Sequence, residues 1–373
     1  MKIERVDLYH ISQRLVAPFV TSFGPQQQRD SLILTVHGDG LSGWGECVAT
    51  NDPGYSYETV QTAWHILTDF LIPAVLGWTF EEPWEVPEKL SFVRGHPLAK
   101  AAVEQAVWDI AARRDNLSFA QKLAAPYEEG PRTRVRVGVS IGIQPTIADT
   151  LNVIREKVAQ GYGRIKLKIK PGHDVKVAEA ARTAFPELPL MLDANSAYTL
   201  GDAPVLQVMD PLNLLMLEQP LGYRDIYEHS LLRPQIQTPL CLDESVHSVA
   251  DARFALAIGA CDIINIKPAR VGGWTEARGI HDLCREEGVP VWCGGMLETG
   301  VGRAGQLALA SLPGFTLPGD ISATDRYYAV DITPPFTLNA EDSTIDVPDG
   351  PGLGVEVDRK QLKRVTLRQE TFS

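Results

Sequence analysis

Five charged residues recur at an almost constant interval through the middle of the chain. Successive members are 25 residues apart, with a last interval of 24: Lys168, Asp193, Glu218, Asp243 and Lys267. Each of them closes a short apolar run. A fixed period of this length indicates that one supersecondary unit is repeated, and an apolar strand, a helix and two loops fill it. The pattern therefore predicts parallel β/α units whose strand ends bring these charges to one mouth of a barrel.

The repeated unit accounts for only part of the chain. A β/α barrel takes about 250 residues, and the chain has 373. We therefore predict an α/β protein, a (β/α)7β TIM-like barrel with an α+β N-terminal capping domain. The expected boundaries are 1–130 for the capping domain, 131–325 for the modified barrel with the catalytic site, and 326–373 for a C-terminal segment that returns to the capping domain.

Local patterns assign elements within these boundaries. In the capping domain we expect strands at 2–12, 31–38 and 43–47 and helices at 57–75, 83–91 and 97–114. In the barrel we expect a first strand at 135–143, a first helix at 145–160, a seventh strand at 289–293 and an eighth at 314–317. Residues 18–24 and 51–56 are rich in Gly, Pro and aromatic residues, so we expect two loops that cover a neighbouring site.

Composition excludes several classes of partner. The net charge of −12 argues against a nucleic-acid backbone and against an anionic membrane surface. The first residues alternate polar and apolar as a strand does, and no uncharged apolar run reaches the ~20 residues of a membrane span. The five cysteines form no CxxC pair, which is typical of reduced thiols. We therefore expect a cytoplasmic protein that acts on a small molecule.

A lysine-rich strand opens the charged series. In the segment 164–170, Ile165, Leu167 and Ile169 alternate with Lys166, Lys168 and Lys170. Taken alone, this is typical of an edge strand with a solvated lysine face. In a parallel barrel, however, the apolar row packs on the helices, so the lysine row must face inward.

Three acids then end the next three strands. Singly, Asp193, Glu218 and Asp243 are each compatible with a helix N-cap or a loop charge. Together at one barrel mouth they would repel each other unless a cation neutralised them. An all-oxygen ligand set favours a hard ion, Mg²⁺ first and Mn²⁺ second. We expect Asn195 and Glu244 to support these ligands from behind.

Lys267 ends the sixth strand, so Lys168 and Lys267 should flank the metal from two sides. This arrangement suits removal of a proton from a carbon beside a carboxylate, with the metal stabilising the enediolate that forms. A lysine base must be neutral, and lowering its pKa from ~10.4 to ~7–8 takes about 4 kcal/mol. For Lys168 we expect this effect from the dication and from Lys166; for Lys267 we expect it from Arg270.

Two weaker signals lie after the seventh strand. The segment 300–305 matches GxGxxG, with Asp320 20 residues after Gly300, which is formally a dinucleotide fingerprint. A glycine-rich loop that opens a helix is the preferred interpretation, and its N–H groups would suit a carboxylate. Met296 lies in a segment at the barrel mouth, where it either lines the pocket or simply packs.

At these residues the chain resembles the enolase superfamily, in its muconate-lactonizing subgroup. The matching features are Lys-x-Lys at 166–168, the acids at 193, 218 and 243, and the lysine at 267. The segments 166–172, 193–196, 265–273 and 292–300 resemble the o-succinylbenzoate synthases and the related N-succinylamino acid racemases. The Pro-Ala-Arg after Lys267 departs from the more familiar Pro-Gly-Arg of the family.

The resemblance implies a reaction and roles. The reaction is the Mg²⁺-dependent syn-dehydration of 2-succinyl-6-hydroxy-2,4-cyclohexadiene-1-carboxylate in menaquinone biosynthesis. It implies that Lys168 removes the α-proton and then protonates the departing hydroxyl, that Lys267 stabilises the enediolate, and that Lys166 binds the substrate carboxylate. Further candidate substrate contacts are Ser140, Asn195, Tyr55 and Met296. A homo-oligomer is the family habit.

Other activities stay open on sequence alone. One is N-succinylamino acid racemase, alone or beside the synthase, with one lysine for each face of the substrate; Arg270 leaves this choice open. Dipeptide epimerase and muconate cycloisomerase would use the same scaffold. A metal-free lyase with a Schiff base on Lys168 or Lys267, and a non-catalytic binding protein, belong to different classes.

Overall fold

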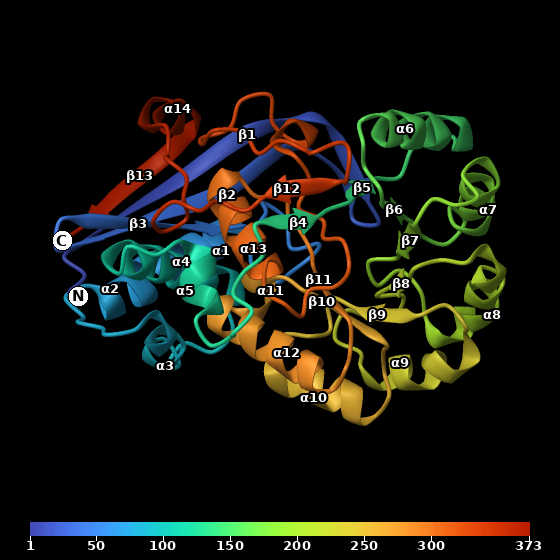
Figure 1. The fold of residues 1–373 in the computed structure, drawn as a ribbon, viewed down its shortest axis with the longest axis horizontal. Coiled ribbons are helices and arrows are strands. Elements are labelled where there is room, and N and C mark those ends of the chain that lie inside the picture. The colour runs from blue at the N-terminus through green and yellow to red at the C-terminus, as the bar shows by residue number, and fades with distance from the viewer.

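The structure is a computed structural model that describes residues 1–373. Its N-terminal part is built on a four-stranded antiparallel sheet with the order β13-β1-β2-β3. The strands are β1 (Arg5–Thr21), β2 (Gly24–Gly38), β3 (Leu41–Cys47) and, from the far end of the chain, β13 (Thr366–Phe372). In Figure 1 the red β13 lies beside the blue β1, so both ends of the chain meet in one sheet.

Helices cover one side of this sheet. They are α1 (Val60–Ile66), a π-helical turn (Leu67–Leu71), α2 (Ile72–Val75), α3 (Val86–Lys89), α4 (Pro97–Arg114) and α5 (Phe119–Ala124). The predicted helix at 97–114 matches α4, whereas α5 was not predicted. Helix α4 lies almost against the backbone of β3, because a Cβ atom on Gly45 would be 1.9 Å from the Ala102 carbonyl oxygen. Glycines in β3 are therefore needed for the close approach of sheet and helix.

The middle of the chain forms a curled parallel sheet of seven strands, which run β11-β10-β9-β8-β7-β6-β5 across it. Their bounds are β5 (Val139–Ile141), β6 (Ile165–Lys168), β7 (Leu190–Asp193), β8 (Leu217–Glu218), β9 (Leu240–Leu242), β10 (Ile263–Ile266) and β11 (Val291–Cys293). The strand order follows the chain, as repeated β/α units require. The period of 25 residues therefore predicted the sheet correctly.

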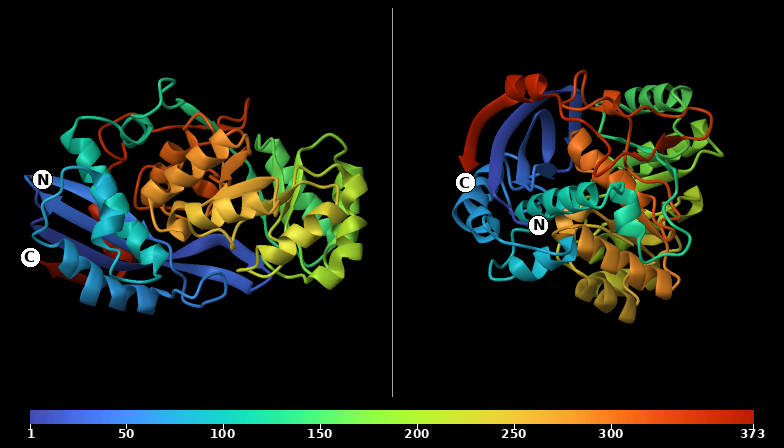
Figure 2. Two further views of the ribbon diagram at one scale, coloured as in Figure 1. Left: turned by 90° about the horizontal axis from the view of Figure 1, so that it is seen from below. Right: turned by 60° about the vertical axis from the view of Figure 1, so that its left-hand side comes forward.

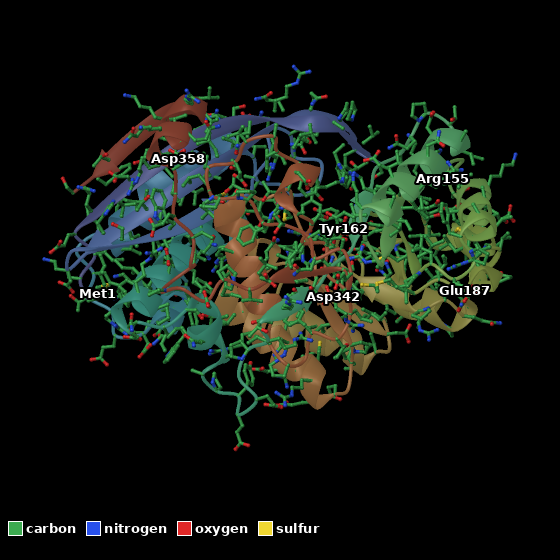
Figure 3. All side chains as sticks on the ribbon, turned by 45° about the horizontal axis from the view of Figure 1, so that its top comes forward. Met1, Arg155, Tyr162, Glu187, Asp342 and Asp358 are labelled. Carbon is green, nitrogen blue, oxygen red and sulfur yellow. The ribbon has the colours of Figure 1, made fainter.

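Helices cover the outside of the curled sheet. They are α6 (Ile147–Ala159), α7 (Val175–Ala184), α8 (Ala203–Gln207), α9 (Tyr227–Leu232), α10 (Val249–Ala257), α11 (Pro268–Val271), α12 (Trp274–Glu286) and α13 (Gly300–Ala310). Figure 2 shows these helices around the sheet: α11, α12 and α13 pack against the N-terminal domain, whereas α6, α7, α8 and α9 form the outer end of the molecule. In Figure 3, Arg155 and Glu187 mark this outer end of the molecule, opposite Met1. None of the helices is both long and apolar enough to cross a membrane.

Side chains alternate across the curled sheet as predicted. Ile165 and Leu167 of β6 belong to the large hydrophobic core, whereas Lys166 and Lys168 face the inside. A small separate cluster of buried residues lies beneath the inward charges. Each member lies in a different strand or directly before it: Met191, Met216, Cys241, Ile263 and Trp292. This apolar plug fills the floor of the curled sheet, so the charged layer above it can be reached only from the carboxyl ends of the strands.

The eighth strand is the clearest departure from the expected barrel. The segment 314–317 forms no regular strand, and the parallel ladder of seven strands does not close. Isolated bridges join Phe315 to Val291 and Gly319 to Val137, so this segment spans the gap between the two edges of the sheet without a ladder. The predicted first strand is also shorter than expected, because 134–136 leaves to pair as β4 (Arg134–Arg136) with β12 (Thr344–Asp346).

The expected loop at 18–24 is instead part of a long hairpin. Strands β1 and β2 continue past the N-terminal sheet, with a register shift between Arg14 and Phe19 that accommodates Pro18. The hairpin tip reaches the curled sheet, where the Ile143 amide donates to the Val20 carbonyl at 2.8 Å. The prediction that this stretch covers a neighbouring site is confirmed, although its conformation was predicted wrongly. The five cysteines are all unpaired.

Candidate active site

Five charged residues form one layer at the carboxyl ends of consecutive strands. Lys168, Asp193 and Glu218 are the last residues of β6, β7 and β8, and Asp243 and Lys267 directly follow β9 and β10. The two lysines therefore flank the three acids in the order of the strands. All five side chains are buried. The structure brings together the whole charged series that the sequence period picked out.

Lys168 is held by two groups from the neighbouring strand end. Its Nζ donates to Asp193 Oδ2 at 2.5 Å and to Asn195 Oδ1 at 2.7 Å. The amide of Asn195 then donates to Glu244 Oε1 at 2.9 Å. Asn195 thus links the lysine to a second buried carboxylate, which places it behind the charged layer as predicted. Its φ of 42° is a backbone conformation that Asn tolerates better than most residues.

Lys267 is surrounded by three groups. Its Nζ donates to Asp243 Oδ2 at 2.6 Å and to the Tyr55 hydroxyl at 3.1 Å, and it lies 4.5 Å from the Tyr55 ring centroid. The Tyr55 hydroxyl donates to the other oxygen of Asp243 at 3.1 Å. Tyr55 comes from the predicted loop at 51–56, so this loop also reaches the site. The N-terminal domain therefore contacts one of the two candidate catalytic lysines directly.

The expected lowering of the Lys267 pKa by Arg270 is not what this arrangement gives. Burial by itself would lower the Lys267 pKa, but the negative charge of Asp243 raises it well above its ordinary value. Arg270 does not face Lys267; its guanidinium binds Asp243 and the carbonyl oxygens of Val246 and Asn265. The prediction considered the charge of Arg270 and not that of Asp243, which contacts both cations.

Lys166 bridges several acids. Its Nζ lies 2.5 Å from Asp320 Oδ2, 3.1 Å from Asp193 Oδ2 and 3.0 Å from Glu218 Oε2. It also lies 4.9 Å from the ring centroid of Trp292 in the apolar floor. Burial would lower the pKa of Lys166, but Asp320, Glu218 and Asp193 raise it well above its ordinary value. Lys166 is therefore a permanent cation in this site.

The three acids are unequal in charge. Burial raises the pKa of Asp193, but the ammonium groups of Lys168 and Lys166 more than offset this and hold it well below its usual range. Burial followed by the negative charge of Asp193 raises the pKa of Glu218 well above its usual value. Burial and the charges of Asp243 and Asp193 raise the pKa of Glu244 to about 7. Asp193 therefore binds a proton far less readily than Glu218 and Glu244 do.

The donor set fits a hard divalent cation, although the carboxylates do not form a cage. No three of them converge closely enough to share one ion, since the lysine ammonium groups lie between them. One ammonium, that of Lys166, nevertheless contacts both Asp193 and Glu218, so a single cation can reach two of the three. The ligands on offer are carboxylate oxygens, without the Cys or His that zinc prefers. A cation would also offset the repulsion between Asp193 and Glu218.

A cavity of about 140 Å³ opens onto the charged layer. Of the candidate residues, Lys166, Lys168, Lys267, Ser140, Asn195, Tyr55 and Met296 line it. Glu244 and Arg270 do not line it, in keeping with a place behind the ligands. The Ser140 hydroxyl is buried and has no hydrogen-bond partner, so it is available to a ligand. Both predicted loops contribute walls, through Phe19 and Phe23 and through Tyr55.

The amides of the GxGxxG segment donate hydrogen bonds to carboxylates of the protein itself. Gly300 and Gly302 lie in the first turn of α13, and their amides donate to Asp331 at 2.9 Å and to Glu46 at 3.0 Å. A Cβ on Gly300 would be 1.7 Å from Thr333 Oγ1. Acidic side chains of the protein and close packing against Thr333 thus fill the space at the start of α13. The dinucleotide interpretation is therefore wrong, and the preferred one, a loop whose amides hold a carboxylate, is confirmed.

Sequence reasoning missed several residues of the site. Asp320 pairs with Lys166 and with Arg164 at 2.6 Å, and Asn265 donates to Glu218 Oε1 at 2.7 Å. Asp320 follows the expected eighth strand, so a search for charged residues at strand ends, which found the other members, could also have found Asp320. Asn265 lies two residues before Lys267 and so shares its face of β10. Arg29, Leu297 and Tyr327 also line the cavity, and no local signal pointed to them.

Comparisons with known proteins agree with this architecture. Residues 5–123 match the mandelate racemase/muconate lactonizing enzyme N-terminal domain, and residues 149–361 match the enolase C-terminal domain-like family. An o-succinylbenzoate synthase of Geobacillus stearothermophilus is 51% identical over 373 residues, which cover 100% of this chain and 98% of the relative. An N-succinylamino acid racemase of an Amycolatopsis species is 48% identical over 367 residues, which cover 98% of each.

A solved structure supports the same assignment. A member of the enolase superfamily from Listeria innocua superposes with a TM-score of 0.94 at 41% identity, over 100% of this chain and 99% of that one. The first match covers β1, β2 and β3, and the second covers β6 to β11 with all the charged strand ends. The chain therefore belongs to the enolase superfamily.

Proposed function

We propose that this protein is an o-succinylbenzoate synthase that dehydrates 2-succinyl-6-hydroxy-2,4-cyclohexadiene-1-carboxylate with the help of Mg²⁺. One observation carries the proposal: two lysines, Lys168 and Lys267, flank three strand-end carboxylates and line one cavity. The relatives that bear the synthase name support the choice of substrate, since three of them are 46–51% identical over the whole chain. The dipeptide epimerase and muconate lactonizing structures, at 21–22% identity, share only the fold.

In this proposal Lys168 carries the proton. Its Nζ takes the proton from the carbon beside the ring carboxylate and gives it to the departing hydroxyl on the same face, which leaves as water. Asp193 and Asn195 orient the ammonium at 2.5 and 2.7 Å. A lysine with fixed partners on one side presents its lone pair to the other side, which is where a general base must meet its substrate.

Lys267 acts on the opposite side as a fixed positive charge. The negative charge of Asp243 keeps it protonated, and its contacts with Tyr55 hold it at the cavity wall. As the α-proton leaves, negative charge grows on the substrate carboxylate, and a preorganised ammonium stabilises that charge. Lys166, Ser140, Asn195, Tyr55 and Met296 all line the cavity, and we assign them to substrate binding.

We assign the Mg²⁺, with Mn²⁺ as a substitute, to Asp193, Glu218 and Asp243, which would have to release the ammonium groups of Lys166 and Lys267 to converge on one ion. When bound, the ion would draw electron density from the substrate carboxylate and so acidify the neighbouring C–H bond. Glu244 and Arg270, which contact Asn195 and Asp243, would hold these partners in place.

N-succinylamino acid racemase is the second candidate, alone or as an additional activity. The observation that favours it is that both lysines line the same cavity, since racemisation needs one proton carrier on each face. The Amycolatopsis relative of that name is nearly as similar to this chain as the synthases are. A Schiff base on either lysine fits less well, because Nζ of Lys168 contacts Asp193 and Nζ of Lys267 contacts Asp243, so each amine would have to leave a carboxylate to attack a carbonyl carbon.

The test is a pair of assays on one preparation. Purified protein with Mg²⁺ should convert the cyclohexadiene precursor to o-succinylbenzoate, and it should exchange the α-proton of an N-succinylamino acid with D₂O. Activity in the first assay alone supports the synthase, and activity in both supports the dual enzyme. Protein that does neither would sink the proposal, and activity that survives EDTA together with borohydride trapping would favour the Schiff-base lyase.

The proposal also covers the domain boundaries, the location in the cell and the oligomeric state. We assign 1–130 and 326–373 to the capping domain and 131–325 to the barrel, with 314–317 in the place of the eighth strand of a (β/α)7β barrel. The bridges from Phe315 and Gly319 to the two edges of the sheet support this assignment. We also propose a cytoplasmic homo-oligomer; light scattering of the purified protein measures its mass directly.

A further inference from the structure

The cations that line the cavity differ in one respect. Lys166, Lys168 and Lys267 each contact a carboxylate. The fourth cation, Arg29 of β2, also lines the cavity but forms no ion pair. Its guanidinium donates instead to three carbonyl oxygens: Nη1 to Ala49 at 3.2 Å, and Nη2 to Val48 at 2.5 Å and to Met296 at 3.1 Å. Its Nε has no partner.

A buried guanidinium without a counter-ion is unusual. Arg29 is only 2% exposed, and charged side chains are almost never so buried unless they are paired. Carbonyl dipoles compensate part of the lost hydration but leave the net charge in place. Because the surroundings are poorly polarisable, that charge attracts an anion in the same cavity more strongly than a surface charge would. Arg29 is thus an unused positive charge beside a ligand site.

The two acidic side chains that line the cavity do not pair with Arg29. Asp320 is bound to Lys166. Asp52 lines the cavity from the 51–56 loop, but it is exposed, and one of its oxygens accepts from the Gly54 amide at 3.1 Å. Solvent screens an exposed carboxylate far more than a buried one. The N-terminal side of the cavity therefore remains positive at Arg29.

The cavity wall also has apolar side chains that can contact an uncharged part of a ligand. They are Phe19 and Phe23 of the hairpin, Met296 and Leu297 of the β/α part, and Tyr327 of the C-terminal segment. A ligand that fits has an anionic group for the lysines, an uncharged middle and a second anionic group for Arg29. A succinyl chain attached to a carboxylate-bearing carbon framework has this distribution of charge.

We propose that Arg29 is the residue that recognises the second carboxylate of the substrate, the one at the end of its succinyl chain. This inference rests on the proposed function, which supplies the first carboxylate and its place among the lysines. It makes the long β1–β2 hairpin a specificity element, because the same strand that covers the cavity carries the cation that selects an anionic tail.

The test compares substrates that differ only in the tail charge. N-succinyl-L-phenylalanine and its terminal amide have the same shape, and exchange of their α-proton in D₂O gives kcat/KM for each. We expect Arg29→Met to lower the succinyl-to-amide ratio of kcat/KM by about tenfold to a hundredfold, the range for a hydrogen bond between charged groups. Arg29→Lys should restore most of the ratio, since it keeps the charge.

The ratio separates recognition from folding. A variant that is partly unfolded loses activity on both substrates equally, so its ratio does not change. Arg182 of α7 is the matched control, because its guanidinium also binds only backbone carbonyls, including Leu212 at 2.7 Å and Asn213 at 2.9 Å, and lies outside the cavity lining. Arg182→Met should reduce stability and leave the ratio at the wild-type value. An unchanged ratio in Arg29→Met would overturn the inference.

Equilibrium binding keeps this result distinct from the proposed function. Calorimetric titration with o-succinylbenzoate and with its side-chain amide measures the same charge preference without turnover. If the wild-type protein binds o-succinylbenzoate more tightly than the amide and Arg29→Met loses this preference, the inference stands even where the catalytic assays fail. If the wild-type protein binds both equally or binds neither, Arg29 does not select the carboxylate.

Discussion

Replacing Glu104 by glutamine should change how the stability of this protein depends on pH. Glu104 lies on α4, is 1% exposed and receives hydrogen bonds at Oε1 from the Thr275 amide at 2.9 Å and from Trp108 Nε1 at 3.0 Å. Its other oxygen, Oε2, has no partner and packs on Gly273. Burial raises the pKa of Glu104 to about 7. The hydrogen bond with Thr275 links α4 of the N-terminal domain to the start of α12, which follows Lys267 closely in the sequence.

The direction follows from proton binding. An acid whose folded pKa is raised keeps its proton in the folded state while the unfolded chain loses it. Glu104 therefore contributes its full stabilisation of the folded state below the unfolded pKa of 4.5, and this contribution is lost as the pH rises to about 7. A shift from 4.5 to about 7, at ~1.36 kcal/mol per pKa unit, costs the wild type about 3 kcal/mol at pH 8. Glutamine cannot ionise, so the variant escapes this loss.

The measurement is a thermal melt of both proteins between pH 4.5 and pH 8. With an unfolding entropy of ~2.1 cal/mol/K per residue, about 3 kcal/mol corresponds to a shift in Tm of about 4 °C for a chain of this length. We expect the Tm of Glu104→Gln, relative to the wild type, to rise by about that amount across the range. Glu179→Gln, on the exposed face of α7, is the control. A Tm difference that stays constant with pH would refute the reasoning.

Three further predictions concern the site and its support. Lys168→Ala should lower kcat for dehydration by ~10²–10⁴, the contribution of general acid–base catalysis. Lys267→Ala should instead abolish α-proton exchange from only one enantiomer of an N-succinylamino acid. If either variant loses exchange from both enantiomers, the two lysines do not act on opposite faces of the substrate. Removal of divalent ions with EDTA should abolish activity and lower the Tm, and Mg²⁺ or Mn²⁺ should restore both; a Tm that does not respond to the ions would count against the three acids as ligands. Gly45→Ala should destabilise the protein by about 1–3 kcal/mol or more in a denaturant titration, because its Cβ would collide with the Ala102 carbonyl. Gly201→Ala, whose Cβ would make only an ordinary contact of 3.6 Å with Thr199 Oγ1, should change stability little.

Much of the charged layer was predictable because its cause is local and repeated. Each inward residue ends an apolar strand, and alternation fixes which side chains share a face. The period therefore identified Lys168, Asp193 and Lys267 without any knowledge of how the sheet curls. The same rule applied to Asp320, but the segment before it bridges the sheet edges without a ladder of its own, so its strand signal was weak.

The contribution of the N-terminal domain was harder to predict, because it depends on contacts between distant segments. Pro18 and the glycine at the hairpin tip indicated a loop, yet pairing with β2 extends β1 through them, with a register shift that no local pattern specifies. Tyr55 was expected to touch substrate; it lines the cavity, and its hydroxyl also contacts Lys267 and Asp243, which no local pattern indicated. Arg29 gave no sequence signal at all, since an arginine in a strand is ordinary until its burial and its partners are known.

This division has a consequence for relatives with different activities. The curled sheet supplies the lysines and acids, which set the reaction, whereas the β1–β2 hairpin and the loop of Tyr55 supply the cavity wall, which sets the substrate. Overall identity weighs both parts together, so values of 51% to a synthase and 48% to a racemase barely separate the two names. We therefore expect the residues that decide between them to lie in the wall. Exchanging the hairpin tip between such relatives should therefore move substrate preference while proton exchange at the lysines persists.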